Sequence, residues 1–450
     1  MAGGTWTSQN KVLPGVYINV SSQGSLNAAV GSRGVVAMAE PLSWGPTGVI
    51  SEYLPGQDTT ELIGYPLTSP KALFINEIFR GSNRTAAPRL LYLYRPAGTG
   101  GAAATASIGQ LTVTAKYNGV RGNDLSIIIT EDPDNESTYI VETVIDGAVV
   151  DSQSIKDLSN LADNAWVNFS GSGTTITEDA GKALTGGKDP TVAASDYAAF
   201  MTALEPYQFD VVIYDGTDST TMQALAAFVQ RVSNNIGQKC QVVMADADTD
   251  SEFVISVKNG LTLQDETVLT PQQATWWVGG AEAGATYYQS LTYAQHPYAL
   301  AANPKLTEAE LTEAVQAGEL AFTDTFDVVK VCQDINTLTT FTASKGQEFS
   351  KNRVMRVLMQ FCNDIYSYFS STFIGSTNNN EDGRSLLKAY IVQYLNEMQA
   401  NGGIQNFEAD DVTVQPGDAI DAVLINVLVQ PVDSIEKIYM SVTVTVSAEA

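Results

Sequence analysis

The sequence is poor in the residues on which most enzymes and nucleic-acid-binding proteins depend. Its 450 residues include one histidine and three cysteines. Its 24 lysines and arginines stand against 50 aspartates and glutamates, which gives a formal net charge of −26. Because phosphate binding draws its affinity from clustered cations, this balance argues against nucleic acid as a partner. No uninterrupted apolar run reaches the roughly 18 residues of a membrane-spanning helix, so we predict no membrane span.

Catalytic motifs are also missing. The single histidine, His296, lies in the segment YAQHPYAL, where a packed or interface histidine is favoured over a catalytic base. The chain has no GxSxG motif and no Walker A lysine loop. Its cysteines, Cys240, Cys332 and Cys362, are far apart in the sequence, which predicts reduced thiols rather than disulfides or a metal knuckle. We therefore predict a protein that is not an enzyme and requires no cofactor.

One acidic segment is similar to a calcium-binding loop. Asp246, Asp248 and Asp250 occupy alternate positions, as carboxylate ligands do in such a loop. Ser251, however, stands where the loop needs glycine, and Val257 stands where the bidentate glutamate belongs. A polar loop after a strand is the better interpretation, so we predict no metal site here.

The middle of the chain alternates between strand and helix patterns. From about residue 191, apolar strand-like segments are separated by amphipathic helical ones: FDVVIYD, TMQALAAFVQRV, KCQVVMAD and TPQQATWWVGGAEAGA. Strands joined by helices of this length imply parallel pairing in an α/β layer. Trp276 and Trp277 in the last helix are interpreted as core residues.

The stretch from about residue 98 to 189 has a different composition. It is rich in threonine, serine, glycine and asparagine, with alternating β-branched residues and turn signals at Asn118-Gly119 and Asp146-Gly147. It carries thirteen acidic and five basic residues, so it should face solvent. The expected fold is therefore an α+β or α/β multidomain protein with a mixed α/β core domain, an inserted all-β domain and strand-like terminal arms.

Two helices and two further strands are predicted near the C-terminus. Apolar residues recur at three- and four-residue spacing over 349–373 and again over 384–400, where Gly402-Gly403 ends the second helix. The segments AVLINVLVQP and EKIYMSVTVTVSA follow, both with strand patterns.

Both chain ends have the pattern of a strand without a local partner. Residues 12–20 place Val16, Ile18 and Val20 on one face with Tyr17 between them, and near the other end Val442, Val444 and Val446 alternate with threonines. An unpaired strand exposes backbone groups that can pair with any sheet edge. Each could join an edge of its own domain or the sheet of a neighbouring molecule.

Several segments resemble the phage tail sheath family. The resemblance runs through nearly the whole chain and is carried by PGVYINV, GVVAMAEPLSWGP, YNGVRGNDLSI, WWVGGAEAGA, KNRVMRVLMQF and FIGSTNNNEDGRSLLKAYIVQYL. More narrowly, the sequence is similar to sheaths of Gram-positive myophages, defective prophage particles and phage-tail-like bacteriocins. The resemblance implies a structural subunit that stacks as hexameric rings around a tail tube. The rings contract to drive the tube through a bacterial cell envelope, without a cofactor.

The same resemblance implies how the chain is divided. Terminal arms would pair as strands with neighbouring subunits, which favours exchange between subunits over local pairing. The arm residues would be Val16, Tyr17, Ile18, Val20, Val442, Val444 and Val446. The expected domains are an N-terminal arm (1–22), a core domain (23–97 and 191–330), an inserted protruding β domain (98–190), a tube-facing domain (331–434) and a C-terminal arm (435–450).

A locally basic region suggests a contact with the tube. From Lys330 to Arg356 there are five bases against two acids, the reverse of the overall balance. The candidate tube-facing residues are Arg353, Arg356, Arg384 and Lys388. Alternatively, these bases neutralise acids of the same chain or of a neighbouring subunit.

The partners implied by the resemblance are other copies of this chain, the tail tube protein, and baseplate and tail terminator proteins. The N-terminus lacks a basic segment followed by an apolar one, so we expect assembly in the bacterial host cytoplasm and later release in a virion or phage-tail-like particle. Two alternatives remain: a sheath of another contractile injection or secretion system, or a cell-wall-binding or cell-wall-degrading tail component. The latter would use the β insertion, which contains a single tryptophan, Trp166.

Overall fold

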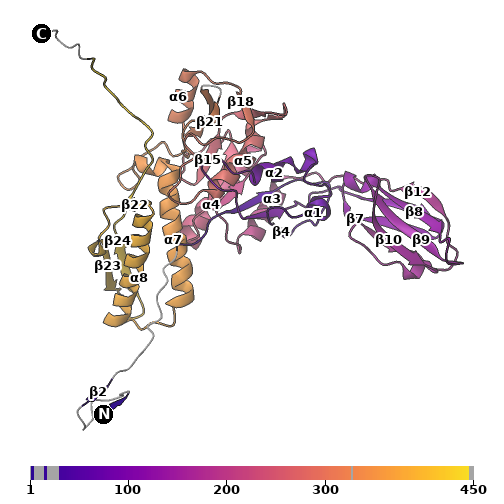
Figure 1. The fold of residues 1–450 in the computed structure, drawn as a ribbon, viewed down its shortest axis with the longest axis horizontal. Helices are drawn as coiled ribbons and strands as arrows, with labels where there is room; N and C mark the ends of the chain where they lie inside the picture. Colours follow the sequence, from indigo (N-terminus) through magenta and orange to yellow (C-terminus); the bar gives the residue numbers. More distant parts are fainter. Residues whose placement is uncertain (1, 5–14, 18–29, 326–327, 445–450) are drawn as a thin grey trace.

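The computed structural model describes residues 2–4, 15–17, 30–325 and 328–444. The molecule is elongated (Figure 1), with a layer of two long helices at one end, an α/β region in the middle and a β-sheet unit at the other end. This arrangement confirms the predicted mixed α/β multidomain fold. No helix in the described ranges is long and apolar enough to cross a membrane.

The middle region is built on a seven-stranded sheet in the order β19-β15-β14-β13-β3-β5-β4. Every neighbouring pair is parallel except β4 and β5, which are antiparallel. The parallel pairing confirms the prediction made from alternating strands and helices. The strands are β3 (Val35–Ala39), β4 (Ile50–Tyr53), β5 (Leu90–Tyr94), β13 (Val211–Ile213), β14 (Gln241–Ala245), β15 (Val254–Val257) and β19 (Glu319–Leu320).

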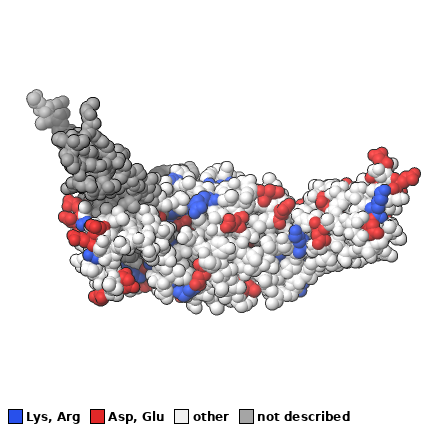
Figure 2. All heavy atoms as spheres, turned by 90° about the horizontal axis from the view of Figure 1, so that it is seen from below, with Lys and Arg blue, Asp and Glu red and all other residues white. Residues whose placement is uncertain are grey.

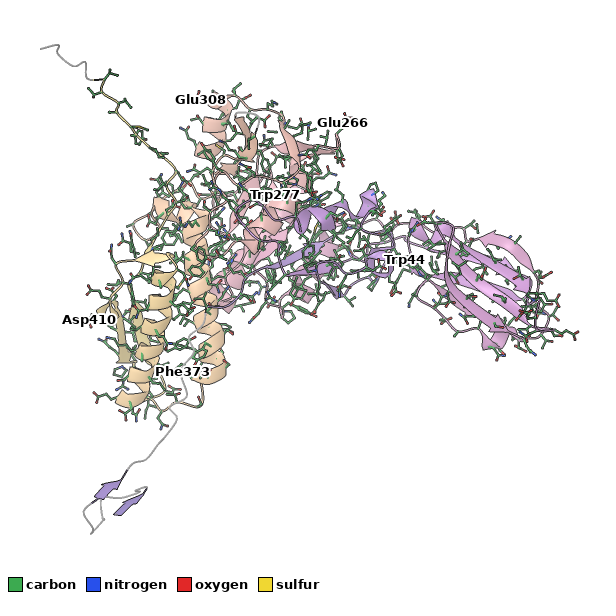
Figure 3. All side chains as sticks on the ribbon, viewed as in Figure 1. Trp44, Glu266, Trp277, Glu308, Phe373 and Asp410 are labelled. Carbon is green, nitrogen blue, oxygen red and sulfur yellow. The ribbon has the colours of Figure 1, made fainter. Side chains whose placement is uncertain are left out.

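Helices cover both faces of this sheet, and each face has its own apolar core. On one face α5 (Pro271–Gly284) packs on β13 and β14, and α2 (Leu73–Ile78) packs on α5. Trp277 lies buried in this core, in the middle of the molecule in Figure 3, which confirms its interpretation as a core residue. On the other face are α3 (Ala194–Leu204) and α4 (Ser219–Arg231), whose apolar side chains pack against the alternate strand residues.

Shorter elements complete this region. One helical segment begins with a short 3₁₀ turn, Pro70–Ala72, and continues as α2. The remaining elements are α1 (Thr60–Ile63), β16 (Gly260–Leu263), β17 (Val268–Leu269), β18 (Ala299–Asn303), α6 (Glu308–Gln316), β20 (Phe322–Thr325) and β21 (Val328–Val331).

Residues 103–183 form the separate β-sheet unit. Its two sheets, ordered β11-β7-β6 and β10-β9-β8-β12, enclose one apolar core. The β9–β10 turn places Asp146 and Gly147 at φ of 52° and 78°, the left-handed conformation that a two-residue hairpin turn needs. The strands are β6 (Ala103–Ile108), β7 (Leu111–Asn118), β8 (Leu125–Glu131), β9 (Tyr139–Ile145), β10 (Ala148–Ile155), β11 (Val167–Ser170) and β12 (Asp179–Ala183).

The β unit is fixed to the middle region by buried contacts. Trp44 lies at the junction (Figure 3) and is fully buried, with its ring 5.2 Å from that of Tyr117 and 5.1 Å from that of Trp166. The guanidinium of Arg95 donates to the carbonyl of Gly45 at 2.6 Å and to that of Asn118 at 2.7 Å. The ring contacts of Trp44 and the hydrogen bond to Asn118 cross from one unit to the other and hold the two units against each other.

The helical layer contains α7 (Asn352–Thr372) and α8 (Glu381–Ala400), close to the predicted 349–373 and 384–400. Apolar residues of both helices form a core with a β-hairpin, β23 (Val412–Pro416) and β24 (Val423–Val427). Phe373, just after α7, marks the far end of this layer in Figure 3. Two further short strands, β22 (Ile404–Gln405) and β25 (Gln430–Pro431), pair with each other and contact the two helices.

Candidate interface at the chain ends

The described residues were searched for groups of side chains that could hold a metal ion. No group of three or more potential metal ligands was found there. Asp250, one of the three aspartates similar to a calcium loop, instead accepts hydrogen bonds from the backbone of Thr339 and Thr340. His296 is buried, with Nε2 2.6 Å from Oε2 of Glu77, as predicted for a packed histidine. The three cysteines form no disulfide, and burial raises the pKa of Cys240 to about 12.

The last part of the described C-terminal segment extends away from the body of the molecule. It leaves the upper end of the helical layer in Figure 1, and no strand is assigned to residues 432–444, contrary to the strand predicted there. The pattern is strand-like, but none of the strands described in the structure pairs with this segment. Its large apolar residues are more than three-quarters exposed: Ile435, Ile438, Tyr439, Met440, Val442 and Val444. Val446 lies outside the described residues.

The N-terminal segment is described in two pieces. Strand β1 (Ala2–Gly4) pairs in parallel with β2 (Gly15–Tyr17), with Ala2 opposite Gly15. The predicted arm residues Val16 and Tyr17 fall in β2, whereas Ile18 and Val20 lie outside the described residues.

The helical layer presents strand edges that another strand could join. The β23–β24 hairpin packs on α8, and Val412, the first residue of β23, is buried. Within the described part of the chain, this sheet has only two strands, so its outer backbone groups have no ladder partner there. An edge of this kind is a template for strand addition.

Arg356, one of the four candidate tube-facing residues, is buried inside the chain. Its guanidinium has no exposed surface and forms ion pairs with Glu282 of α5 and, at 2.6 Å, with Asp334. Burial acts to raise the pKa of Asp334, but Arg356 together with hydrogen bonds from Glu282 and the backbone of Leu291 outweighs that effect, so the pKa lies below its ordinary value. Arg356 therefore fastens α7 to the middle region, and the prediction that it faces a tube is wrong for this conformation.

The other three candidates reach the surface. Arg353 is half-buried, with Nη2 3.4 Å from the carbonyl of Gly402. Arg384 donates to Oδ1 of Asn379 at 3.0 Å, and Lys388 lies 3.9 Å from Asp410. On the face seen in Figure 2, acidic side chains are spread from the helical layer to the β unit, with fewer basic ones between them. Arg384 and Lys388 lie one turn apart on α8, as predicted, while Arg353 is on α7.

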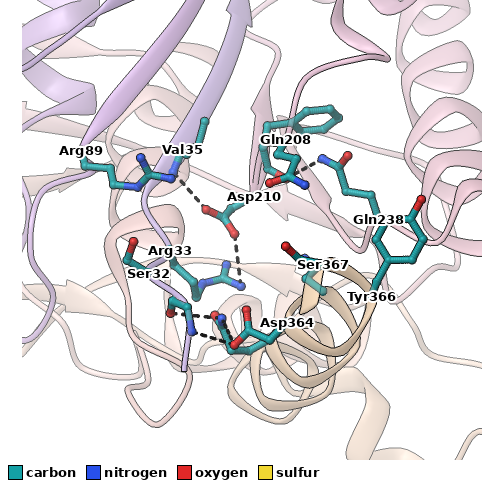
Figure 4. A pocket seen from close by; sticks show the side chains of 14 residues that line it. Ser32, Arg33, Val35, Arg89, Gln208, Asp210, Gln238, Asp364, Tyr366 and Ser367 are labelled. Atoms are coloured by element: carbon teal, nitrogen blue, oxygen red, sulfur yellow. Dashed lines mark hydrogen bonds and ion pairs between the residues drawn. The ribbon is translucent and has the colours of Figure 1, made fainter. Parts of the chain in front are cut away.

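Two carboxylates that the sequence did not point to hold the segments leading to the chain ends. Asp364 of α7 accepts a 2.8 Å hydrogen bond from the backbone N–H of Gly31. Beside it, in a pocket between the middle region and the helical layer, Arg33 lies 3.6 Å from Asp210 (Figure 4). Near the other end, Glu436 pairs with Lys351. These pairs are too far apart in sequence for any local pattern to connect them.

Three family models match consecutive parts of the chain. They are described as the phage tail sheath protein beta-sandwich domain, the phage tail sheath protein central domain and the phage tail sheath C-terminal domain, and they match residues 99–189, 191–337 and 344–445.

Relatives and solved structures agree with these matches. The chain is 34% identical to the phage-like element PBSX protein XkdK of Bacillus subtilis, covering 99% of this chain and all of that one. A crystal structure of the sheath tail protein from Desulfitobacterium hafniense has 42% identity and a TM-score of 0.85, covering 95% of this chain and 99% of that one. The helical sheath of the anti-feeding prophage in its contracted state shares the fold at 13% identity, with a TM-score of 0.58 over 96% of this chain and 99% of that one.

Proposed function

Because this chain belongs to the phage tail sheath family, we propose that it stacks as hexameric rings around a tail tube and contracts to drive that tube through a bacterial cell envelope. The observation that carries the proposal is the exposed apolar segment 435–444. Such a segment lowers its free energy by adding to a sheet edge that shields its side chains. In a homopolymer, that edge belongs to a neighbouring copy.

In this proposal both chain ends act as strands exchanged between subunits. The arms comprise residues 1–22 and 435–450, and the exchanged residues are Val16, Tyr17, Ile18, Val20, Val442, Val444 and Val446. The unpartnered edges of the β23–β24 hairpin supply a place for an incoming strand. Each backbone hydrogen bond so formed contributes about 1 kcal/mol, and the buried valines add to it.

The elongated shape supports an orientation around the tube. The domains would be the core (23–97 and 191–330), the protruding β domain (98–190) and the tube-facing domain (331–434). The helical layer and the β unit lie at opposite ends of the molecule in Figure 1. With the helical layer inside, Arg353, Arg384 and Lys388 would face an acidic tube, and the acidic β unit would face solvent.

Contraction would need no bound cofactor. The free energy would be stored when the sheath assembles on its tube in an extended arrangement. It would be released in a cooperative switch to larger interfaces, with domains moving as rigid bodies and arms as hinges. The contacts of Trp44 with Tyr117 and Trp166, and of Arg95 with Asn118, suit a subunit that moves as one body.

The further partners would be the tail tube, baseplate and tail terminator proteins. Assembly would take place in the host cytoplasm, before release in a virion or phage-tail-like particle. The shared fold with the contracted anti-feeding prophage sheath favours a second candidate, the sheath of another contractile device with the same arm exchange. The genes next to this one would separate the two.

Electron microscopy of the purified protein tests the proposal. Negative staining should show striated tubes or rings formed by the full chain. A variant lacking residues 1–20 should remain a folded, soluble subunit by circular dichroism and size-exclusion chromatography but should form no tubes. Tubes formed equally well without residues 1–20 would contradict the role of the N-terminal arm. A full chain that stays monomeric at every concentration would contradict the function itself.

A further inference from the structure

Helix α7 contacts both segments from which the terminal arms leave the subunit. Lys351 precedes its first residue, and Asp364 lies 13 positions further on. At 1.5 Å per residue these two side chains are separated by about 20 Å along the helix axis. One rigid element therefore spans the two exits.

At the C-terminal exit the chain is held through Glu436. Its carboxylate accepts a hydrogen bond of 2.7 Å from the hydroxyl of Thr292 and another from the side-chain amide of Gln333. It also forms an ion pair with Lys351. The side chain of Glu436 is only 10% exposed, although the apolar residues that follow it are almost fully exposed. Glu436 and Lys437 still line a pocket on the body of the molecule, whereas the large apolar residues from Ile438 to Val444 are exposed.

At the N-terminal exit the chain is held through Asp364. This carboxylate accepts hydrogen bonds from the backbone of Gly31 and from the hydroxyl of Tyr394, at 2.8 and 2.6 Å. Gln360 lies between them and donates both to the carbonyl of Gly31, at 3.2 Å, and to Asp364, at 2.8 Å. Val35 follows Gly31 by four residues, and its backbone N–H donates a hydrogen bond of 3.0 Å to the carboxylate of Asp210. The exit is therefore tied to the helical layer and to the central sheet at once.

We propose that Glu436 and Asp364 are positioning residues that set the place and direction in which the two arms leave the subunit, with α7 as the strut that separates them. This inference rests on the proposed exchange of arms between subunits. An arm tied at its root explores a smaller volume, which raises its effective concentration at the neighbour's edge. Part of the conformational entropy of the arm is then already lost when the subunit folds, so less of it is lost on assembly.

The test compares subunit stability with polymerisation. Glu436→Gln and Asp364→Asn remove one charge each with little change in shape. Their matched controls are Glu61→Gln, at an exposed glutamate on α1, and Asp248→Asn, at an exposed aspartate in a loop of the middle region. Two quantities are measured for each variant and for the unaltered chain. One is the midpoint of thermal unfolding of the soluble subunit, and the other is the critical concentration for tube formation, determined by sedimentation.

We expect the two anchor variants to raise the critical concentration about tenfold, or roughly 1.4 kcal/mol per subunit, with unfolding midpoints close to those of the controls. The charge exchange Lys351→Glu with Glu436→Lys should restore polymerisation lost in Glu436→Lys alone, and equal unfolding midpoints of the two variants would separate this rescue from a general change in stability. Critical concentrations equal to those of the controls would overturn the inference, as would a failure of the charge exchange to restore tubes. Absence of tubes from the unaltered chain would instead overturn the proposed function.

Discussion

The backbone N–H of Gly31 donates a hydrogen bond of 2.8 Å to the carboxylate of Asp364, 333 residues further along the chain. The two residues fit so closely that a Cβ atom on Gly31 would lie 2.4 Å from Oδ1 of Asp364. Such a separation is far inside van der Waals contact, so any side chain at position 31 must displace the carboxylate. The N-terminal exit thus depends on the absence of a side chain here.

A Gly31→Ala substitution should therefore weaken assembly more than it weakens the fold. The methyl group would push Asp364 away and break its bonds with the backbone at position 31. We expect an increase of several-fold in the concentration needed for tube formation, with an unfolding free energy within about 1 kcal/mol of the original. The control is Gly48→Ala, at a glycine with no atom within 4 Å of the added Cβ. Its positive φ adds local strain, so it tests whether replacing a glycine is enough to weaken tube formation. Unchanged tube formation by Gly31→Ala would contradict the prediction.

The second prediction concerns Arg356. Its guanidinium contacts both Glu282 and Asp334, all three being almost fully buried. Arg356→Met would leave two buried carboxylates without their partner, and breaking a buried pair in this way costs about 3–5 kcal/mol. The measurement is the free energy of unfolding in urea. Arg384→Met, at a partly exposed arginine, should cost less than about 1 kcal/mol, and equal losses in the two variants would show that Arg356 is not the fastening that we describe.

These residues show what could be predicted from the sequence and what could not. The helices α7 and α8 and the parallel strands were predictable because their apolar periodicity is local. The burial of Arg356 could not be predicted, because its partners are 74 and 22 residues away in the sequence and the local charge balance does not reveal them. The strand pattern near Val442 and Val444 predicted a strand that is not seen, because a strand needs a partner edge that the described chain does not place beside it.

The third prediction tests whether the β unit is rigidly attached. Trp44 fills the junction between the β unit and the middle region and packs on Tyr117 and Trp166. Trp44→Ala should cost about 3–5 kcal/mol and uncouple the two units. Differential scanning calorimetry should then show a separate transition for the β unit. Val149→Ala, at an exposed position on β10, serves as the control, and a single unchanged transition in Trp44→Ala would contradict the idea.

The fourth prediction concerns acid stability. Burial acts to raise the pKa of Glu77, but hydrogen bonds with His296 and Arg80 outweigh it, so the pKa lies below its ordinary value. The unfolded chain therefore binds this proton first, and the stability that Glu77 provides is complete above about pH 4.3 and is lost as the pH falls toward the folded-state pKa. Glu77→Gln should lower the unfolding free energy at pH 7 and should flatten its decline below pH about 4.3.

The control for this pH series is Glu61→Gln, at an exposed glutamate on α1. Its unfolding free energy should follow that of the original chain at every pH. The difference between the two variants isolates the buried pair from the many surface carboxylates that titrate in the same range. A slope for Glu77→Gln as steep as that of the control would show that the pair of Glu77 and His296 does not control acid stability.

The last prediction concerns the three bases that reach the surface of the helical layer. If this layer faces an acidic tube, the single reversals Arg353→Glu, Arg384→Glu and Lys388→Glu should each reduce sheath assembly on purified tubes. The reduction should be larger at low salt, because interactions between exposed charges are screened over about 10 Å at 0.1 M salt. Lys116→Glu, on the distant β unit, carries the same change in charge and should leave assembly on tubes unchanged. Unaltered assembly in all three reversals would indicate instead that these bases serve acids of their own chain, as Lys388 does with Asp410.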